Sequence, residues 1–231
     1  EFFRTTLHME GAYCAVYLDP RPETAGRLLE SLEPVDLPGT MRFIARSVRG
    51  ELELTRGNVR TAALIQRVSL RYAGNWRSIL GSGSQWELYI LSMCLVTDVE
   101  LSPDDAVELD ARAVRARATS LLREILSDPA PRQRDIPTLM AFAAAVGLSA
   151  VAAEDAGPDR RAVGAELVAT ALAVGTNQTC RLLSHDYLRS RTERLDALAL
   201  AQAEERIRSL DRGGLVAHAA DLAGRLAGEV G

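Results

Sequence analysis

The sequence predicts an all-α protein, organised as a degenerate α-solenoid of antiparallel helix pairs with a C-terminal capping pair. Long stretches rich in Ala, Leu and Arg alternate with short breaks of Gly, Pro and Asp, which is the rhythm of helices joined by turns. Hydrophobic residues form 47% of the 231 residues and aromatic residues only 5%, so aromatic side chains typical of strands are scarce. We therefore expect one helical-repeat domain over residues 1–231.

Four helices are expected in the first part of the chain: Phe3–Tyr17, Glu23–Leu32, Met41–Arg56 and Val59–Tyr72. Apolar residues recur at helical spacing in the first two, for example at Leu28, Leu29 and Leu32. The third and fourth form the clearest pair because Gly57 separates them, and Gly suits a helix C-terminus that needs a left-handed residue. Residues 74–84 are expected to be loose, with a flexible joint at Gly81-Ser82-Gly83-Ser84.

Six helices are expected in the rest of the chain: Trp86–Thr97, Pro103–Leu126, Thr138–Ala153, Arg161–Val174, Tyr187–Leu210 and Gly214–Leu226. Ser102 followed by Pro103 is a strong helix start, since a hydroxyl caps well and Pro fits the first helical position. Thr138–Ala153 is nearly uncharged, so we expect it to be central and enclosed. The segments after about residue 178 are more charged, as expected of capping helices.

The charge pattern argues against nucleic-acid binding by this chain. All 27 basic residues are Arg, the acids number 31, and the formal net charge is −4. The arginines alternate with Asp and Glu along most helices, whereas nucleic-acid-binding surfaces are concentrated and basic. No run is long and apolar enough for a membrane span, and no signal peptide is visible. Because the chain does not begin with Met, we expect it to be part of a longer protein.

Cysteine and histidine usage predicts neither disulfides nor a metal. Cys14, Cys94 and Cys180 are far apart in sequence and show no zinc spacing with the three histidines. We expect them to be buried free thiols in the cytoplasm. A pairing of Cys180 with His185 as nucleophile and base is a hypothesis based only on their proximity in sequence.

No catalytic residue, cofactor or metal is predicted, although one acidic motif offers an alternative. Asp104, Asp105 and Glu108 resemble the DDxxD-type motif with which all-α terpenoid synthases hold Mg²⁺ and a diphosphate. The favoured interpretation is that these acids complement the dipole of a helix start. An all-α Mg²⁺-dependent enzyme remains the alternative.

Two stripes are the candidate partner-binding residues. Arg42, Arg46 and Arg49 recur at helical spacing on one helix, and Trp86, Tyr89 and Met93 recur on another. The alternative interpretations are a solvated face for the arginines and ordinary core for the aromatic stripe. A closed apolar pocket lined by Trp86 and Tyr89 would instead indicate an all-α sensor of a small molecule.

The helix pairs resemble tetratricopeptide-like repeats, with Gly50, Gly57 and Ala62 at small-residue positions of that motif. The turns are spaced more widely than regular repeats, so the array is degenerate. From about Met41 onward, the order of segments resembles the C-terminal helical-repeat region of actinobacterial transcription regulators of the SARP/AfsR or LuxR-like type. The segments that carry this likeness are Asp135–Leu139 leading into an Ala-rich helix, Ala165–Ala171, and Leu215–Ala219.

This resemblance implies a regulatory, protein-contacting region and carries over no catalytic residue. The implied partner is a protein, either the regulator's own upstream domains or another chain, and a homo-oligomer is a further option. Partner binding would act by favouring one packing of the helices.

Overall fold

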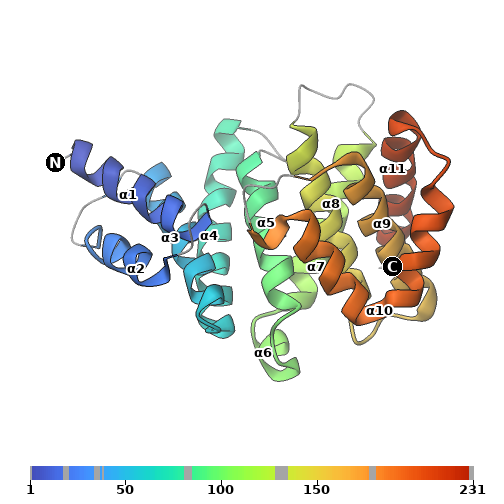
Figure 1. Ribbon diagram of the computed structural model, residues 1–231, viewed down its shortest axis with the longest axis horizontal. Helices are drawn as coiled ribbons and strands as arrows, with labels where there is room; N and C mark the ends of the chain where they lie inside the picture. The colour runs from blue at the N-terminus through green and yellow to red at the C-terminus, as the bar shows by residue number, and fades with distance from the viewer. Residues whose placement is uncertain are drawn as a thin grey trace. The chain divides into compact units, whose positions relative to one another are not determined.

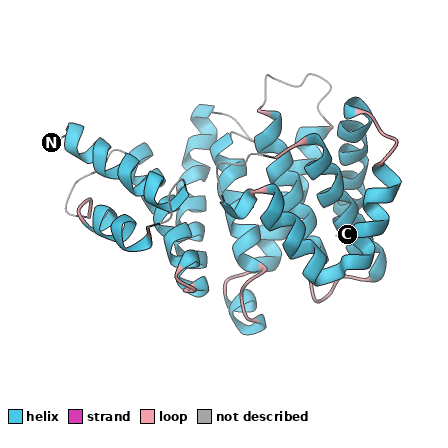
Figure 2. Cartoon of the chain, in the orientation of Figure 1, coloured by secondary structure: helices cyan, strands magenta, loops and turns pink. Residues whose placement is uncertain are grey.

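The computed structural model describes residues 2–17, 21–33, 37, 39–80, 85–127, 135–176 and 181–228. Side chains are described in these ranges except at 2–4, 17, 39–41, 72–80, 85, 86 and 181. Within this part of the chain every regular element is a helix and none is a strand, as Figure 2 shows, which confirms the all-α prediction. None of the helices described there is long and apolar enough to cross a membrane.

The elements are shown along the chain in Figure 1. Their bounds are α1 (Phe2–Tyr17), α2 (Pro22–Glu30), α3 (Gly39–Thr55), α4 (Val59–Leu80), α5 (Gln85–Asp98), α6 (Pro103–Glu108), α7 (Ala111–Leu126), α8 (Ile136–Val151), α9 (Pro158–Val174), the 3-10 turn η1 (Arg181–Leu183), α10 (His185–Ile207) and α11 (Arg212–Gly228). The chain divides into two compact units, residues 1–79 and residues 80–231, and each is described by itself.

The division falls within the stretch 74–84 that was expected to be loose. That expectation is wrong for residues 74–80, because α4 continues without a break to Leu80. Gly74 does not end the helix, since one Gly inside a helix costs only about 1 kcal/mol. Gly81–Ser84 lie outside the described residues.

Helices α1, α2 and α3 build the core of the first unit. Its buried members come from all three helices and from the segment after α2: Met9, Ala12, Ala15, Ala25, Leu29, Leu32, Leu37, Val48 and Leu52. Cys14 is exposed on α1, which corrects the expectation that it is buried, whereas Cys94 is buried and Cys180 lies outside the described residues. The three helices therefore share one apolar centre made mostly of Leu and Ala.

The turn between α3 and α4 has the geometry that its glycine predicts. Gly57 adopts φ +81°, its N–H donates to the Leu54 carbonyl at 3.0 Å, and the Asn58 N–H donates to the Glu53 carbonyl at 2.8 Å. These two bonds are a Schellman motif, which satisfies carbonyls left over at the end of a helix. Asn58 Nδ2 also donates to Glu53 Oε2 at 2.6 Å. The predicted helix break at Gly57 is confirmed, whereas the packing of the two helices as a pair stays a prediction.

Replacing Gly57 with Ala is expected to lower the free energy of unfolding by about 1 kcal/mol, because an L side chain is unfavourable at positive φ. The cause is the backbone alone, since a Cβ at Gly57 would meet no atom within 4 Å. Urea denaturation followed by circular dichroism measures the change. Gly57→Asn is the control and should lower the free energy of unfolding by less than Gly57→Ala does, because Asn tolerates the left-handed region. Equal losses for the two variants would contradict this explanation.

Helices α8 and α9 form the centre of the second unit. All residues from Leu139 to Val151 are buried, which confirms that this Ala-rich helix is enclosed. Helices α5, α7, α10 and α11 pack around the α8–α9 pair. Gly147 and Gly164 face each other where α8 and α9 cross, so the two backbones come into direct contact. Because α11 packs against α7 as well as α9, contacts are not limited to neighbours along the chain. The solenoid of stacked pairs stays a prediction.

Two predicted helices are interrupted in the structure. The expected single helix from Pro103 to Leu126 is two helices, because Asp110 adopts φ 53° and its carboxylate accepts from the Ala113 N–H, starting α7. Asp tolerates the left-handed region because its short polar side chain bonds locally. Within α10, Asp196 departs from helical geometry, and its carboxylate accepts from the Ala199 N–H at 2.9 Å. In both cases the non-helical backbone of the Asp ends one helical segment, and its side chain caps the start of the next segment.

Candidate functional site

A pocket of about 270 Å³ lies between the C-terminal end of α2 and one face of α3. Its apolar wall is formed by Leu29, Leu32 and Leu37, which belong to the buried core of the first unit. Its polar wall carries Arg42, Arg46, Arg49 and Glu33. The structure therefore brings the three predicted arginines together at one concave surface.

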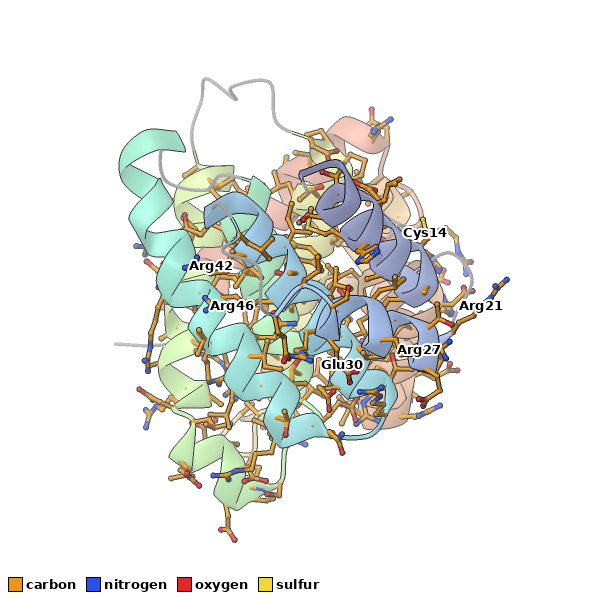
Figure 3. The ribbon with its side chains drawn as sticks, turned by 90° about the vertical axis from the view of Figure 1, so that its left-hand side faces the viewer. Cys14, Arg21, Arg27, Glu30, Arg42 and Arg46 are labelled. Atoms are coloured by element: carbon orange, nitrogen blue, oxygen red, sulfur yellow. The ribbon has the colours of Figure 1, made fainter. Side chains whose placement is uncertain are left out.

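The arginines line the pocket because they occupy successive turns of α3. Val48 and Leu52 lie on a neighbouring face of the same helix and belong to the buried core that also contains Leu29, Leu32 and Leu37, so the arginines lie at the edge of that core. Arg42 Nη2 donates to the Leu37 carbonyl at 3.0 Å, and Arg49 Nη1 forms an ion pair with Glu33 Oε1. Figure 3 shows Arg42 and Arg46 one above the other along this helix. Each arginine is half-buried.

The chemistry of the pocket suits an anionic group. Guanidinium groups stay charged at all ordinary pH values and bind carboxylates or phosphates through paired N–H donors. Of the described residues that line the pocket, three are Arg and one is Glu, whereas the whole chain carries a net charge of −4. Partial burial strengthens such charge interactions, because less water screens them. Among the described residues that line the pocket, none is Ser, Cys or His.

The predicted aromatic stripe belongs to the second unit, where the side chains of Tyr89 and Met93 are described. Met93 is fully buried, which corrects the prediction that it contacts a partner. The reason is that α5 is apolar on nearly all sides and packs against both α7 and α8. Tyr89 is half-buried, and the side chain of Trp86 lies outside those described. A small-molecule pocket lined by Trp86 and Tyr89 stays a prediction.

The acidic motif adopts the local role expected of a helix start. The Ser102 hydroxyl accepts from the Asp105 N–H at 3.3 Å and donates to Asp105 Oδ2 at 2.8 Å. Asp104 and Asp105 both lie in the first turn of α6. Among the described residues, no cluster of three or more His, Cys, Asp or Glu has a geometry that would hold a metal ion. The Mg²⁺-dependent activity stays an untested alternative.

The proposed catalytic pair is not described in full. His185 Nδ1 lies 3.7 Å from Asp186 Oδ1, and the Asp186 side chain is fully exposed. Cys180 lies outside the described residues, so its distance to His185 is not part of this structure. His185 itself is the first residue of α10, which begins at the Ser184 cap.

Partly buried ion pairs between distant segments of the chain are the polar features that the sequence did not predict. Glu166 on α9 joins Arg206 on α10 to His218 on α11. Glu100 accepts from the Tyr187 hydroxyl at 2.9 Å and from Arg191 at 2.7 Å. Burial, followed by the nearby Glu100 carboxylate, raises the pKa of Tyr187 above its usual range. A single acid inside an apolar helical run, such as Glu166 between Ala165 and Leu167, was the available signal.

Comparisons of this chain with protein-family models, with curated proteins and with solved structures found no match. The function proposed below is therefore inferred from the arginine pocket and from the resemblance of the sequence to regulator repeats.

Proposed function

We propose that this chain is a non-catalytic protein-interaction domain whose arginine pocket binds acidic side chains of a partner protein. The observation that carries the proposal is the grouping of Arg42, Arg46 and Arg49 around an apolar floor. A volume of about 270 Å³ accommodates one or two side chains. It is below the range of about 300–1,000 Å³ usual for small-molecule sites. The preferred occupant is a peptide segment in which an acidic residue lies beside an aliphatic one.

Both walls of the pocket contribute to such recognition. The guanidinium groups orient a carboxylate, and burial of Leu29, Leu32 and Leu37 against an aliphatic side chain supplies apolar contact. Arg is enriched at protein interfaces because its stem packs while its head forms several hydrogen bonds. A protein is preferred to a nucleic acid as partner because acids outnumber arginines in the chain.

The biological setting of the proposal comes from the sequence resemblance. We infer a cytoplasmic, regulatory role within a bacterial transcription regulator, in which the partner is an upstream domain or another protein. Binding would favour one of the packings available to the helices and would thereby change a neighbouring domain. This setting is independent of the local claim that the pocket binds carboxylates.

Charge reversal at Arg46 tests whether the arginine pocket binds carboxylates. The probe is a fluorescein-labelled peptide of alternating Asp and Leu, and fluorescence anisotropy measures its dissociation constant with the full chain. Arg46→Glu should weaken binding about tenfold, because it replaces attraction with repulsion inside the pocket. The matched control is Arg71→Glu, a change at an exposed position of α4 that does not line the pocket.

The uncharged analogue of the peptide separates charge from apolar contact. A peptide of alternating Asn and Leu should bind the wild-type chain much more weakly than the acidic peptide does. Added salt should raise the dissociation constant of the acidic peptide, because salt screens its charges. Equal binding of both peptides, or equal losses for Arg46→Glu and Arg71→Glu, would contradict the proposed function.

A further inference from the structure

A second cleft, of about 520 Å³, lies within the residue 80–231 unit at the end where α5 and α8 finish and α7 begins. Its deeper wall includes Leu95 and Ala111, which are 1% and 5% exposed. Helix α6 forms the outer wall through Ala106 and Val107. The volume falls within the range of about 300–1,000 Å³ usual for small-molecule sites.

Helix α6 is held at its ends rather than by burial. It has no buried residue, and Val107 is 82% exposed even though it lines the cleft. The Ser102 cap fixes the start of α6, and the left-handed Asp110 fixes the turn after it. An occupant of the cleft would therefore cover apolar surface on α6 that the folded chain leaves in water, which is a source of binding free energy.

The charges around the cleft favour a cation. Four carboxylates line it, from Asp98, Asp110, Glu154 and Asp155, against the guanidinium groups of Arg112 and Arg115. The Arg115 side chain is 20% exposed. Burial lowers the pKa of Arg115, and the Asp155 carboxylate, which acts in the opposite direction, only partly offsets this lowering. Asp155 is 64% exposed and 3.5 Å from Arg115, so this pair is loose and its carboxylate faces water.

We propose that this cleft binds a small organic cation, an amine attached to an apolar body. The ammonium group lies at the mouth beside Glu154 and Asp155. The apolar body lies between Val107 on α6 and the buried wall at Leu95 and Ala111. The acids at the mouth orient the charge, and the apolar walls provide most of the contact area. This site is independent of the arginine pocket, which belongs to the other unit and attracts anions.

Three probes of similar size and different charge test the assignment: 4-phenylbutylamine, 4-phenylbutan-1-ol and 4-phenylbutyrate. Titration of the full chain is followed by methyl chemical shifts of Val107, Leu101 and Leu95. The amine should bind about tenfold more tightly than the alcohol and should shift these methyl signals, whereas the carboxylate should not bind. Equal affinity for amine and alcohol, or shifts at other methyl groups only, would overturn the proposal.

Variants at exposed positions test the two parts of the assignment, because substitutions there are expected to change stability little. The double variant Asp155→Asn with Glu154→Gln should weaken amine binding about tenfold. Val107→Ser should weaken the binding of both the amine and the alcohol. The matched control is Asp159→Asn, at an exposed acid in the first turn of α9 outside the cleft. Unchanged amine binding in the double variant would overturn the charge assignment. Arg46→Glu should leave amine binding intact, so a failure here is distinguishable from a failure of the arginine pocket.

Discussion

Gly147→Ala is expected to lower the free energy of unfolding of the second unit by about 2–3 kcal/mol, because it overpacks the crossing of α8 and α9. A Cβ at Gly147 would lie 2.6 Å from the Gly164 carbonyl oxygen and 2.9 Å from Val168 Cγ2. The first of these neighbours is backbone, which cannot move aside as a flexible side chain does. The helices would have to separate, and the fully buried residues around them would lose contact.

The same substitution at Gly224 is the matched control. Gly224 lies within α11, and a Cβ there would meet no atom within 4 Å. Gly224→Ala should therefore be neutral or should stabilise the chain by up to about 1 kcal/mol, because Ala is the better helix former. Urea denaturation followed by circular dichroism measures both variants. A Gly147→Ala chain as stable as the Gly224→Ala chain would show that the crossing is not close-packed.

Glu166→Ala is expected to lower the free energy of unfolding by about 2 kcal/mol, because it removes a buried charge partner of two helices. Glu166 is 8% exposed. Its Oε1 lies 2.7 Å from His218 Nε2, and its Oε2 accepts from Arg206 Nε at 2.8 Å. The loss is moderate because Arg206 and His218, which are 45% and 26% exposed, regain contact with water. The surface pair of Glu205 and Arg208 is the control, and Glu205→Ala should change stability by about 0.5 kcal/mol or less.

The contribution of Glu166 should also depend on pH. Burial by itself would raise the pKa of Glu166, but the hydrogen bonds from Arg206 and His218 outweigh burial, and the pKa lies below its usual value of 4.5. A carboxyl group with a lowered pKa in the folded state stabilises the protein above its unfolded-state pKa. That stabilisation is lost as the pH falls through the folded-state pKa.

Comparison with Glu166→Gln measures this dependence. The stability difference between the wild type and Glu166→Gln should shrink as the pH falls from 4.5 through the lowered folded-state pKa of Glu166. A difference that stays the same at low pH would mean that the charge of Glu166 does not stabilise the packing of α9, α10 and α11.

Features that depend on neighbours along the chain were predictable. The helix break at Gly57 and the capped start at Ser102 were both recognised, because left-handed turns and N-caps are formed by residues a few positions apart. The arginine stripe of α3 was recognised for the same reason, since helical periodicity alone places Arg42, Arg46 and Arg49 on one face. The breaks at Asp110 and Asp196 were missed because Asp is compatible with either a helix or a cap.

Features that depend on contacts between distant segments were decided by the tertiary structure. An all-apolar helix such as α5 does not show in its sequence which face is buried, and packing against α7 and α8 buried Met93. The arginine stripe became a pocket only because Leu29, Leu32 and Leu37 were brought beside it. Glu166 forms hydrogen bonds with Arg206 and His218, which lie 40 and 52 positions further along the chain. Helix formation is governed by interactions within a few residues, so the sequence alone predicted where most helices lie. Burial and charge pairing depend on which helices meet, so only the folded chain decided which faces are buried and which charges are paired.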